Sequence, residues 1–142
     1  MSEFHFKKIL IIKHGSLGDV INATSVITAI SKKFSNSKID ILTSKPYFSF
    51  FKKMNENYEI HIDNRKGILA TANILFFLSK KKYNLIIDLQ NSNRTKYYSL
   101  FFKIFSKVLI NGTHKYSDYK YKYNKFSPPP VVDGLVNQIK LL

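Results

Sequence analysis

Short aliphatic runs alternate along the chain with segments whose apolar residues recur every three or four positions. The aliphatic runs predict buried strands at Ile9 to Lys13, Ile39 to Thr43, Ile60 to Asp63, Leu85 to Leu89 and, as a candidate fifth, Val108 to Asn111. The periodic segments predict helices from Val20 to Phe34, from Pro46 to Met54, from Ile68 to Lys81 and from Arg94 to Lys107. Alternation of this kind indicates βαβ units, so we expect an α/β domain with a Rossmann-like open parallel sheet. The helix from Ile68 is almost wholly apolar, and we expect it to be largely buried.

The character of the chain changes after the last of these segments. Thr113 to Phe126 alternates Lys and Tyr without a helical period, and Pro128 to Pro130 is a stiff extended segment of the kind that joins domains. A new element begins at Val131. We therefore expect one Rossmann-like domain over residues 1–127, followed by an interdomain linker and the start of a further domain over residues 128–142.

Length and composition narrow the class of protein. The chain has 142 residues, enough for one α/β domain, and its lack of cysteine excludes disulfides and thiolate metal sites. The start of the chain has no signal-peptide pattern, and Ile68 to Leu78 is far shorter than the roughly 20 residues of a membrane-spanning helix. We expect a cytoplasmic protein, free or peripheral on the inner face of the cytoplasmic membrane. The net charge of +14 favours anionic partners, although a chain-wide richness in Lys explains it equally well.

The loop after the first strand carries the candidate chemistry. Its sequence is Gly15-Ser16-Leu17-Gly18-Asp19, and open parallel sheets bind ligands at this edge. The two glycines allow a tight turn and close approach of a substrate, and the following helix presents its positive end. Asp19 suits either of two roles there: it can cap the helix, or it can accept a proton from a hydroxyl in the cleft. Both roles can coexist.

Binding of a nicotinamide or flavin dinucleotide is disfavoured. The G-x-G-x-x-G spacing is absent from this loop, and an acidic residue stands where a pyrophosphate would lie. The second strand ends in Thr43, Ser44 and Lys45 rather than in a ribose-binding acid.

The run from Ile9 to Thr24 resembles the opening motif of the family 9 glycosyltransferases, which include the ADP-heptose:lipopolysaccharide heptosyltransferases. Lys38 to Thr43 and Tyr83 to Gln90 agree with that family in order and spacing, so the resemblance covers nearly the whole chain. Two departures are Ser25, where the family commonly has proline, and Asn91, where glycine often stands.

The resemblance implies the N-terminal, acceptor-side half of a GT-B glycosyltransferase, an architecture of two Rossmann-like domains facing across a cleft. It implies an inverting transfer from a nucleotide sugar, such as ADP-heptose, to a hydroxyl of lipopolysaccharide core or another glycolipid, with Asp19 as the general base. The nucleotide sugar is a substrate, and we expect no cofactor. No D-x-D pair occurs in the chain, so no metal is expected. Since the donor-binding domain is missing, we expect this polypeptide alone to be inactive.

Acceptors of this family are acidic, so basic and polar residues near the strand ends, together with the residues of the loop after the first strand, are candidate acceptor contacts. They are Lys13, Ser16, Leu17, Gly18, Arg65, Lys66, Gln90, Asn91 and Arg94. Arg65, Lys66 and Arg94 have a plainer reading as solvated loop charges, and Gln90 and Asn91 have one as turn residues. We expect Asp88 to orient loop backbone and His14 to line the site.

Two further readings stay open. One is a non-catalytic, basic Rossmann-like module that binds an anionic glycolipid or nucleic acid. Tyr116 to Phe126 superficially resembles a nucleic-acid stripe, but no recognised motif accompanies it, and we expect no nucleic acid. The other concerns the helix after Arg94, where Phe101 and its aromatic neighbours form one face and Lys103 lies on another. Core packing is the default for it, and peripheral contact with an anionic membrane is the alternative.

Overall fold

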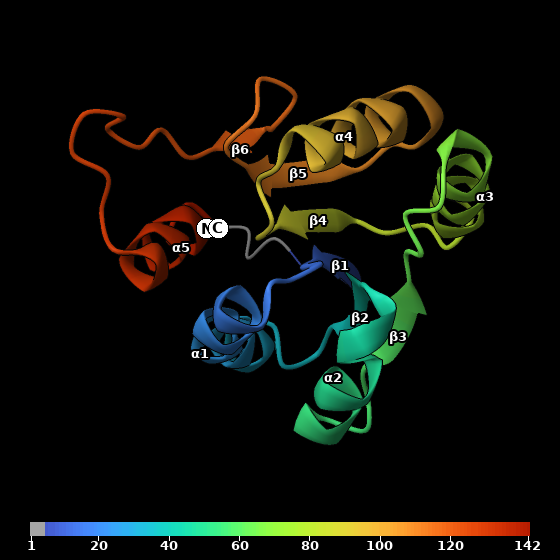
Figure 1. Cartoon of the computed structure of the whole chain (residues 1–142), viewed down its shortest axis with the longest axis horizontal. Helices are drawn as coiled ribbons and strands as arrows, with labels where there is room; N and C mark the ends of the chain where they lie inside the picture. The colour runs from blue at the N-terminus through green and yellow to red at the C-terminus, as the bar shows by residue number, and fades with distance from the viewer. Residues whose placement is uncertain (1–4) are drawn as a thin grey trace.

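A computed structural model describes residues 5–142, and residues 1–4 of the expected first domain lie outside the described part. Six parallel strands form one open sheet with the order β3-β2-β1-β4-β5-β6 (Figure 1). The strands are β1 (Lys8–Ile12), β2 (Lys38–Thr43), β3 (Glu59–Ile62), β4 (Leu85–Asp88), β5 (Leu109–Gly112) and β6 (Tyr119–Lys120). The five strands predicted from aliphatic runs are confirmed, and the expected Rossmann-like α/β class with them. The chain order reverses between β1 and β4, the place where such sheets open a crevice at their carboxyl edge.

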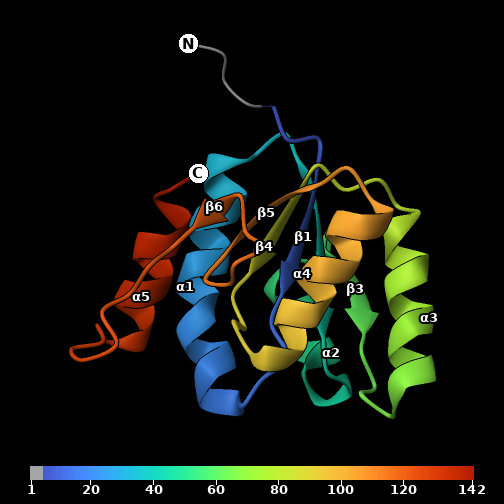
Figure 2. The ribbon, with the colours of Figure 1, turned by 90° about the horizontal axis from the view of Figure 1, so that it is seen from above.

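Helices cover both faces of the sheet (Figures 1 and 2). They are α1 (Leu17–Lys33), the 3-10 turn η1 (Lys45–Tyr47), α2 (Phe48–Met54), α3 (Ile68–Ser79), α4 (Asn93–Phe105) and α5 (Val131–Ile139). One apolar core lies between the sheet and α1, α2 and α5, and it includes Ile27, Phe51 and Leu135. A second core, which includes Leu78 and Phe102, lies under α3 and α4. None of the helices in residues 5–142 is long and apolar enough to cross a bilayer.

One sequence expectation is wrong, and one strand was not predicted. The helix from Ile68 is not largely buried: only Leu75 and Leu78 of α3 are buried, because α3 lies at the end of its layer and packs mainly against α4. The segment after β5 also contains a strand, β6, which pairs with β5 through Asn111 and Tyr119. Two residues are too few to produce an alternating pattern, so the sequence carried no signal for it.

The C-terminal helix α5 packs on this same domain. It contacts α1 and β5, and Leu135 joins the core. The buried Gln138 side chain donates to the Asp88 carbonyl at 2.9 Å and to Asn111 Oδ1 at 3.0 Å, and it accepts from Asn91 Nδ2 at 2.8 Å. The division of the chain at residue 127 stays a prediction.

We predict that Gln138→Leu lowers the free energy of unfolding by about 2–3 kcal/mol, because it leaves buried polar groups of Asp88, Asn91 and Asn111 without partners. Urea unfolding followed by circular dichroism measures the change. The exposed Lys140→Ala is the control and should shift stability by less than about 0.5 kcal/mol. An unchanged unfolding midpoint for Gln138→Leu would show that the amide cluster does not stabilise α5 on the domain.

Candidate functional site

The backbone of the loop between β1 and α1 is held by hydrogen bonds to a glutamine that follows the neighbouring strand β4. Gln90, just past β4, accepts from the backbone N–H groups of His14 at 3.1 Å and Gly15 at 3.4 Å, and its own amide donates to the Gly15 carbonyl at 3.2 Å. Gly15 has a φ of 133°, and a Cβ there would collide with the ring of Tyr47. Glycine is therefore required by the turn itself.

Asp19 lies in the first turn of α1, at the carboxyl edge of the sheet. Its side chain is half-buried, and Ser16 Oγ donates to its Oδ2 at 3.2 Å. Ser16, Leu17 and Gly18 are exposed around it, and a Cβ on Gly18 would meet no described atom within 4 Å. The carboxylate is thus half-exposed among exposed loop residues, near the positive end of a helix.

Lys13, directly after β1, is buried inside the domain. It is only 4% exposed, and its Nζ donates to the Leu89 carbonyl at 3.3 Å. Burial lowers the pKa of Lys13, and the charges of Asp19 and Asp88 partly oppose that shift. Lys13 is therefore a buried amine on which the charges of both Asp19 and Asp88 act.

A buried polar cluster joins three separate strand ends and helices next to the loop. His14 Nε2 lies 3.1 Å from Asp63 Oδ2, and the Tyr98 hydroxyl donates to the same carboxylate. Arg94 donates from Nε to the Tyr98 hydroxyl at 2.5 Å and from Nη2 to Thr71 Oγ1 at 2.6 Å. The sequence indicated Arg94 and His14 but not Asp63 or Tyr98. An acid at the carboxyl end of a predicted strand was the one signal available for Asp63.

Asp63 is a fixed negative charge. Burial raises its pKa, but the contacts with His14, Tyr98 and the backbone N–H of Arg65 outweigh burial and lower the pKa to about 2. This carboxylate therefore stays ionised at neutral pH, and it orients the groups around it.

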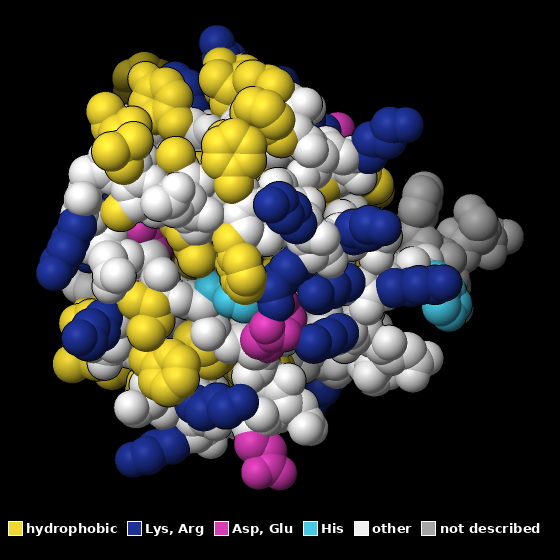
Figure 3. Space-filling model, turned by 90° about the vertical axis from the view of Figure 1, so that its right-hand side faces the viewer, with side chains coloured by type: hydrophobic (Ala, Val, Ile, Leu, Met, Phe, Trp, Pro, Cys, Tyr) yellow, Lys and Arg dark blue, Asp and Glu magenta, His cyan; other side chains and the backbone are white. Residues whose placement is uncertain are grey.

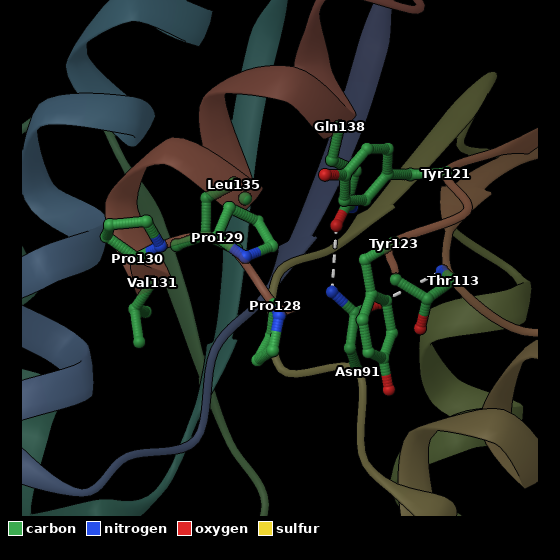
Figure 4. Close-up of a pocket in the computed structure, with 11 residues that line it drawn as sticks. Asn91, Thr113, Tyr121, Tyr123, Pro128, Pro129, Pro130, Val131, Leu135 and Gln138 are labelled. Atoms are coloured by element: carbon green, nitrogen blue, oxygen red, sulfur yellow. Dashed lines mark hydrogen bonds between the residues drawn. The ribbon is translucent and has the colours of Figure 1, made fainter. Parts of the chain in front are cut away.

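Asp88 orients the loop after β4, as expected from the sequence. Its Oδ1 accepts from the backbone N–H groups of Gln90 at 3.0 Å and Asn91 at 2.9 Å, and burial raises its pKa. The Asn91 side chain is turned toward α5, where its Nδ2 donates to the Gln138 side chain (Figure 4). Its Oδ1 accepts from the Thr113 N–H at 3.1 Å. It lines a shallow cavity of about 220 Å³ between Tyr121, Tyr123 and the three prolines. Gln90 and Asn91 are thus both engaged in internal hydrogen bonds.

The remaining predicted cations lie in the loop between β3 and α3. Arg65 and Lys66 are both exposed, and Arg65 has a φ of 53°. This loop and the loop with Asp19 both leave the carboxyl ends of strands, so they lie at the same edge of the sheet (Figure 2). Their side chains are free to meet an anionic ligand.

A second group of ionisable residues lies away from this edge, on β2 and β3. Atoms of Asp40, Glu59 and His61 lie within 4.8 Å of one another, a spacing that would suit a metal ion. Asp40 already accepts from His61 at 3.0 Å, and Glu59 already pairs with Lys38 at 2.8 Å and with Lys81. We therefore describe the group as an ion-pair network beside α3.

Comparison with solved structures defines the class of fold: the chain matches one half of two-domain GT-B glycosyltransferases. A family 9 glycosyl transferase from Veillonella parvula matches with a TM-score of 0.77 and 21% identity, over 97% of this chain and 42% of that one. The E. coli heptosyltransferase WaaC, solved with ADP-2-deoxy-2-fluoro heptose, matches with a TM-score of 0.67 and 16% identity, over 95% of this chain and 48% of that one. WaaC with ADP matches equally well, at 0.67 and 16%, over 95% and 47%. The chain spans less than half the length of these structures.

No protein-family model matches the sequence, and no curated protein matches it significantly. The expected fold is confirmed by structure alone. The roles of individual site residues stay predictions.

We predict a pH-dependent stability difference between the wild-type chain and Asp63→Asn. Because folding lowers the pKa of Asp63 from near 3.8 to about 2, its charge contributes about 2 kcal/mol of stability above about pH 4. That contribution is lost as pH falls through about 2, so the stability gap between the two proteins should narrow from pH 7 to pH 3. Urea unfolding at several pH values measures the gap. The exposed Asp133→Asn is the control, and a gap that does not change with pH would contradict the assignment.

Proposed function

We propose that this chain is the acceptor-side half of an inverting glycosyltransferase of the heptosyltransferase type, with Asp19 as the general base. The observation that carries the proposal is the half-exposed Asp19 carboxylate in the first turn of α1, next to the exposed residues 16–18 at the carboxyl edge of the sheet. The fold match to a structure solved with an ADP-heptose analogue supports the class of donor.

The proposed chemistry is a single displacement. The acceptor hydroxyl oxygen forms a bond to the anomeric carbon of the sugar as the bond from that carbon to the diphosphate breaks, which inverts the configuration. The hydroxyl proton passes to Asp19, and the nucleoside diphosphate leaves with the electron pair. General-base assistance of this kind is typically worth about 10²–10⁴-fold in rate.

The residues near Asp19 have two proposed roles: some contact the acceptor, and others hold the loop in place. We propose that Arg65 and Lys66, both exposed, meet the acidic groups of the acceptor, while the backbone of Leu17 and Gly18 at the start of α1 allows close approach. Lys13 and Gln90 are proposed to hold the loop rather than to bind sugar, since their polar atoms are engaged inside the domain.

Three further predicted contacts have more limited roles. Arg94 is partly exposed and is aimed by Tyr98 and Thr71, which leaves it at the edge of the site. Ser16 orients the Asp19 carboxylate through its hydroxyl. Asn91 supports α5. Donor binding and stabilisation of the leaving diphosphate belong to a second domain in this proposal, so this chain alone would not transfer sugar.

We predict that Asp19→Asn lowers kcat by about 10²–10⁴-fold and changes acceptor affinity by less than about threefold. The assay joins this chain to a donor-binding domain, follows ADP release from ADP-heptose, and measures acceptor binding separately by calorimetry. The matched control is Asp133→Asn, which alters an exposed acid in the first turn of α5 and should leave both quantities unchanged.

The same assay tests the alternative of a non-catalytic module that holds an anionic glycolipid. If Asp19→Asn turns over as fast as the wild type while Arg65→Ala weakens acceptor binding, Asp19 is a helix-terminal residue only. The chain would then be a binding domain.

A further inference from the structure

The outer face of α3 is apolar and uncovered in this domain. The twelve residues of α3 include no charged side chain, and Ile68 and Leu69 at its start are 87% and 82% exposed. Phe76 and Phe77, two turns further on, are 44% and 52% exposed. Helices that are apolar on all sides are normally covered, and contiguous exposed apolar surface marks an interaction site.

The apolar surface continues from α3 onto α4. The Phe76 ring centroid lies 4.9 Å from that of Phe101 and 5.1 Å from that of Phe105, so the two helices share an aromatic contact. Next to it, Ile104 and Phe105 are 65% and 54% exposed. We call this set the α3–α4 apolar surface: Ile68, Leu69, Phe76, Phe77, Ile104 and Phe105.

Cations outnumber acids around this surface, where Glu59 pairs with Lys81 and Asp118 pairs with Lys103. Residues 64–107 include nine Lys or Arg and a single acidic residue, Asp88, which is buried. The exposed cations flank both ends of the helices: Arg65 and Lys66 before α3, Lys80 and Lys82 after it, and Lys107 after α4. Figure 3 shows the side of the molecule that carries α3, with hydrophobic side chains gathered over its upper part and Lys and Arg side chains around them.

We propose that the α3–α4 apolar surface docks on an anionic lipid bilayer. Aliphatic and aromatic side chains at the centre would enter the boundary between headgroups and acyl chains, and the surrounding cations would meet the lipid phosphates. A second copy of this chain fits less well, because pairing the two surfaces would bring their cations together. A nucleic-acid partner would not give the exposed Ile and Leu side chains an apolar environment.

The position of the surface suits a lipid-anchored acceptor. α3 begins at the carboxyl edge of the sheet, as does the loop that carries Asp19 (Figure 2). A bilayer in contact with Ile68 and Leu69 would therefore hold that edge close to the lipid headgroups. This orientation of the acceptor rests on the proposed function, whereas the docking itself does not.

The test is co-sedimentation of the 142-residue chain with vesicles of phosphatidylglycerol and phosphatidylethanolamine, compared with phosphatidylcholine vesicles, at low and high salt. The wild-type chain should bind the anionic vesicles, and salt should weaken that binding. Ile68→Ser with Leu69→Ser should reduce it by roughly tenfold, since both side chains leave the lipid. Phe126→Ser is the matched control, because Phe126 is fully exposed at 100% and lies outside the surface.

Circular dichroism should show both variants folded, since the replaced side chains are exposed. Equal, negligible binding to both vesicle types overturns the proposal. If the double variant binds anionic vesicles as well as the wild type, net charge alone is responsible and the proposal is again wrong. A dimer in sedimentation velocity that the double substitution abolishes would instead assign the surface to a second copy.

The docking proposal and the proposed reaction fail separately. Asp19→Asn should bind vesicles as the wild type does, because Asp19 is not part of the α3–α4 apolar surface. A chain that does not bind vesicles leaves the Asp19 turnover experiment unaffected. Unchanged turnover of Asp19→Asn likewise leaves the result of the vesicle experiment unaffected.

Discussion

The parallel pairing of β1 between β2 and β4 is the constraint on which the candidate site depends. Because the strands run in one direction, every loop that follows a strand emerges at the same edge, and residues distant in sequence become neighbours. His14, Asp63 and Gln90 meet for this reason. The loop between β1 and α1 is constrained at Gly15. A side chain at this position would collide with the Tyr47 ring, and the Gly15 backbone is hydrogen-bonded to the Gln90 side chain. The half-exposed Asp19 follows a turn whose backbone is held by hydrogen bonds.

Patterns along the chain predict the strands well, because Ile9 to Ile12 and Leu85 to Ile87 are aliphatic throughout, as burial on both faces of a sheet demands. The same reasoning fails at α3. Apolar composition reports what a helix is able to bury, but whether a neighbour exists to cover it depends on its place at the end of a layer. The candidate loop was predictable from its glycines. The contacts of Asp63 with Tyr98 were not, because no periodicity reports which side chains meet across separate elements. Gln90 was recognised as polar, yet only the structure shows its amide bonded to backbone.

The Lys and Arg residues that give the chain its positive charge include two groups, one paired with acids and one exposed beside apolar side chains. Lys38 and Lys81 pair with Glu59, and Lys103 pairs with Asp118, so these cations are partly neutralised within the domain. Arg65 and Lys66 instead lie exposed beside apolar side chains. A general Lys richness accounts for the number of charges, but the adjacency of cations and uncovered apolar residues is a property of the fold. That adjacency gives one face of the domain a chemical character different from that of its other surfaces.

The consecutive residues Gln90 and Asn91 face opposite ways, one toward the Gly15 backbone and the other toward Gln138 of α5. Together they form a short mechanical linkage between the last helix and the turn that precedes Asp19. A displacement of α5 would therefore act on the backbone of Gly15 through hydrogen bonds between side chains, from Gln138 to Asn91 and from Gln90 to Gly15. The turn before Asp19 is thus coupled to residues 131–139 by polar contacts, in addition to the apolar contact that Leu135 makes with the core.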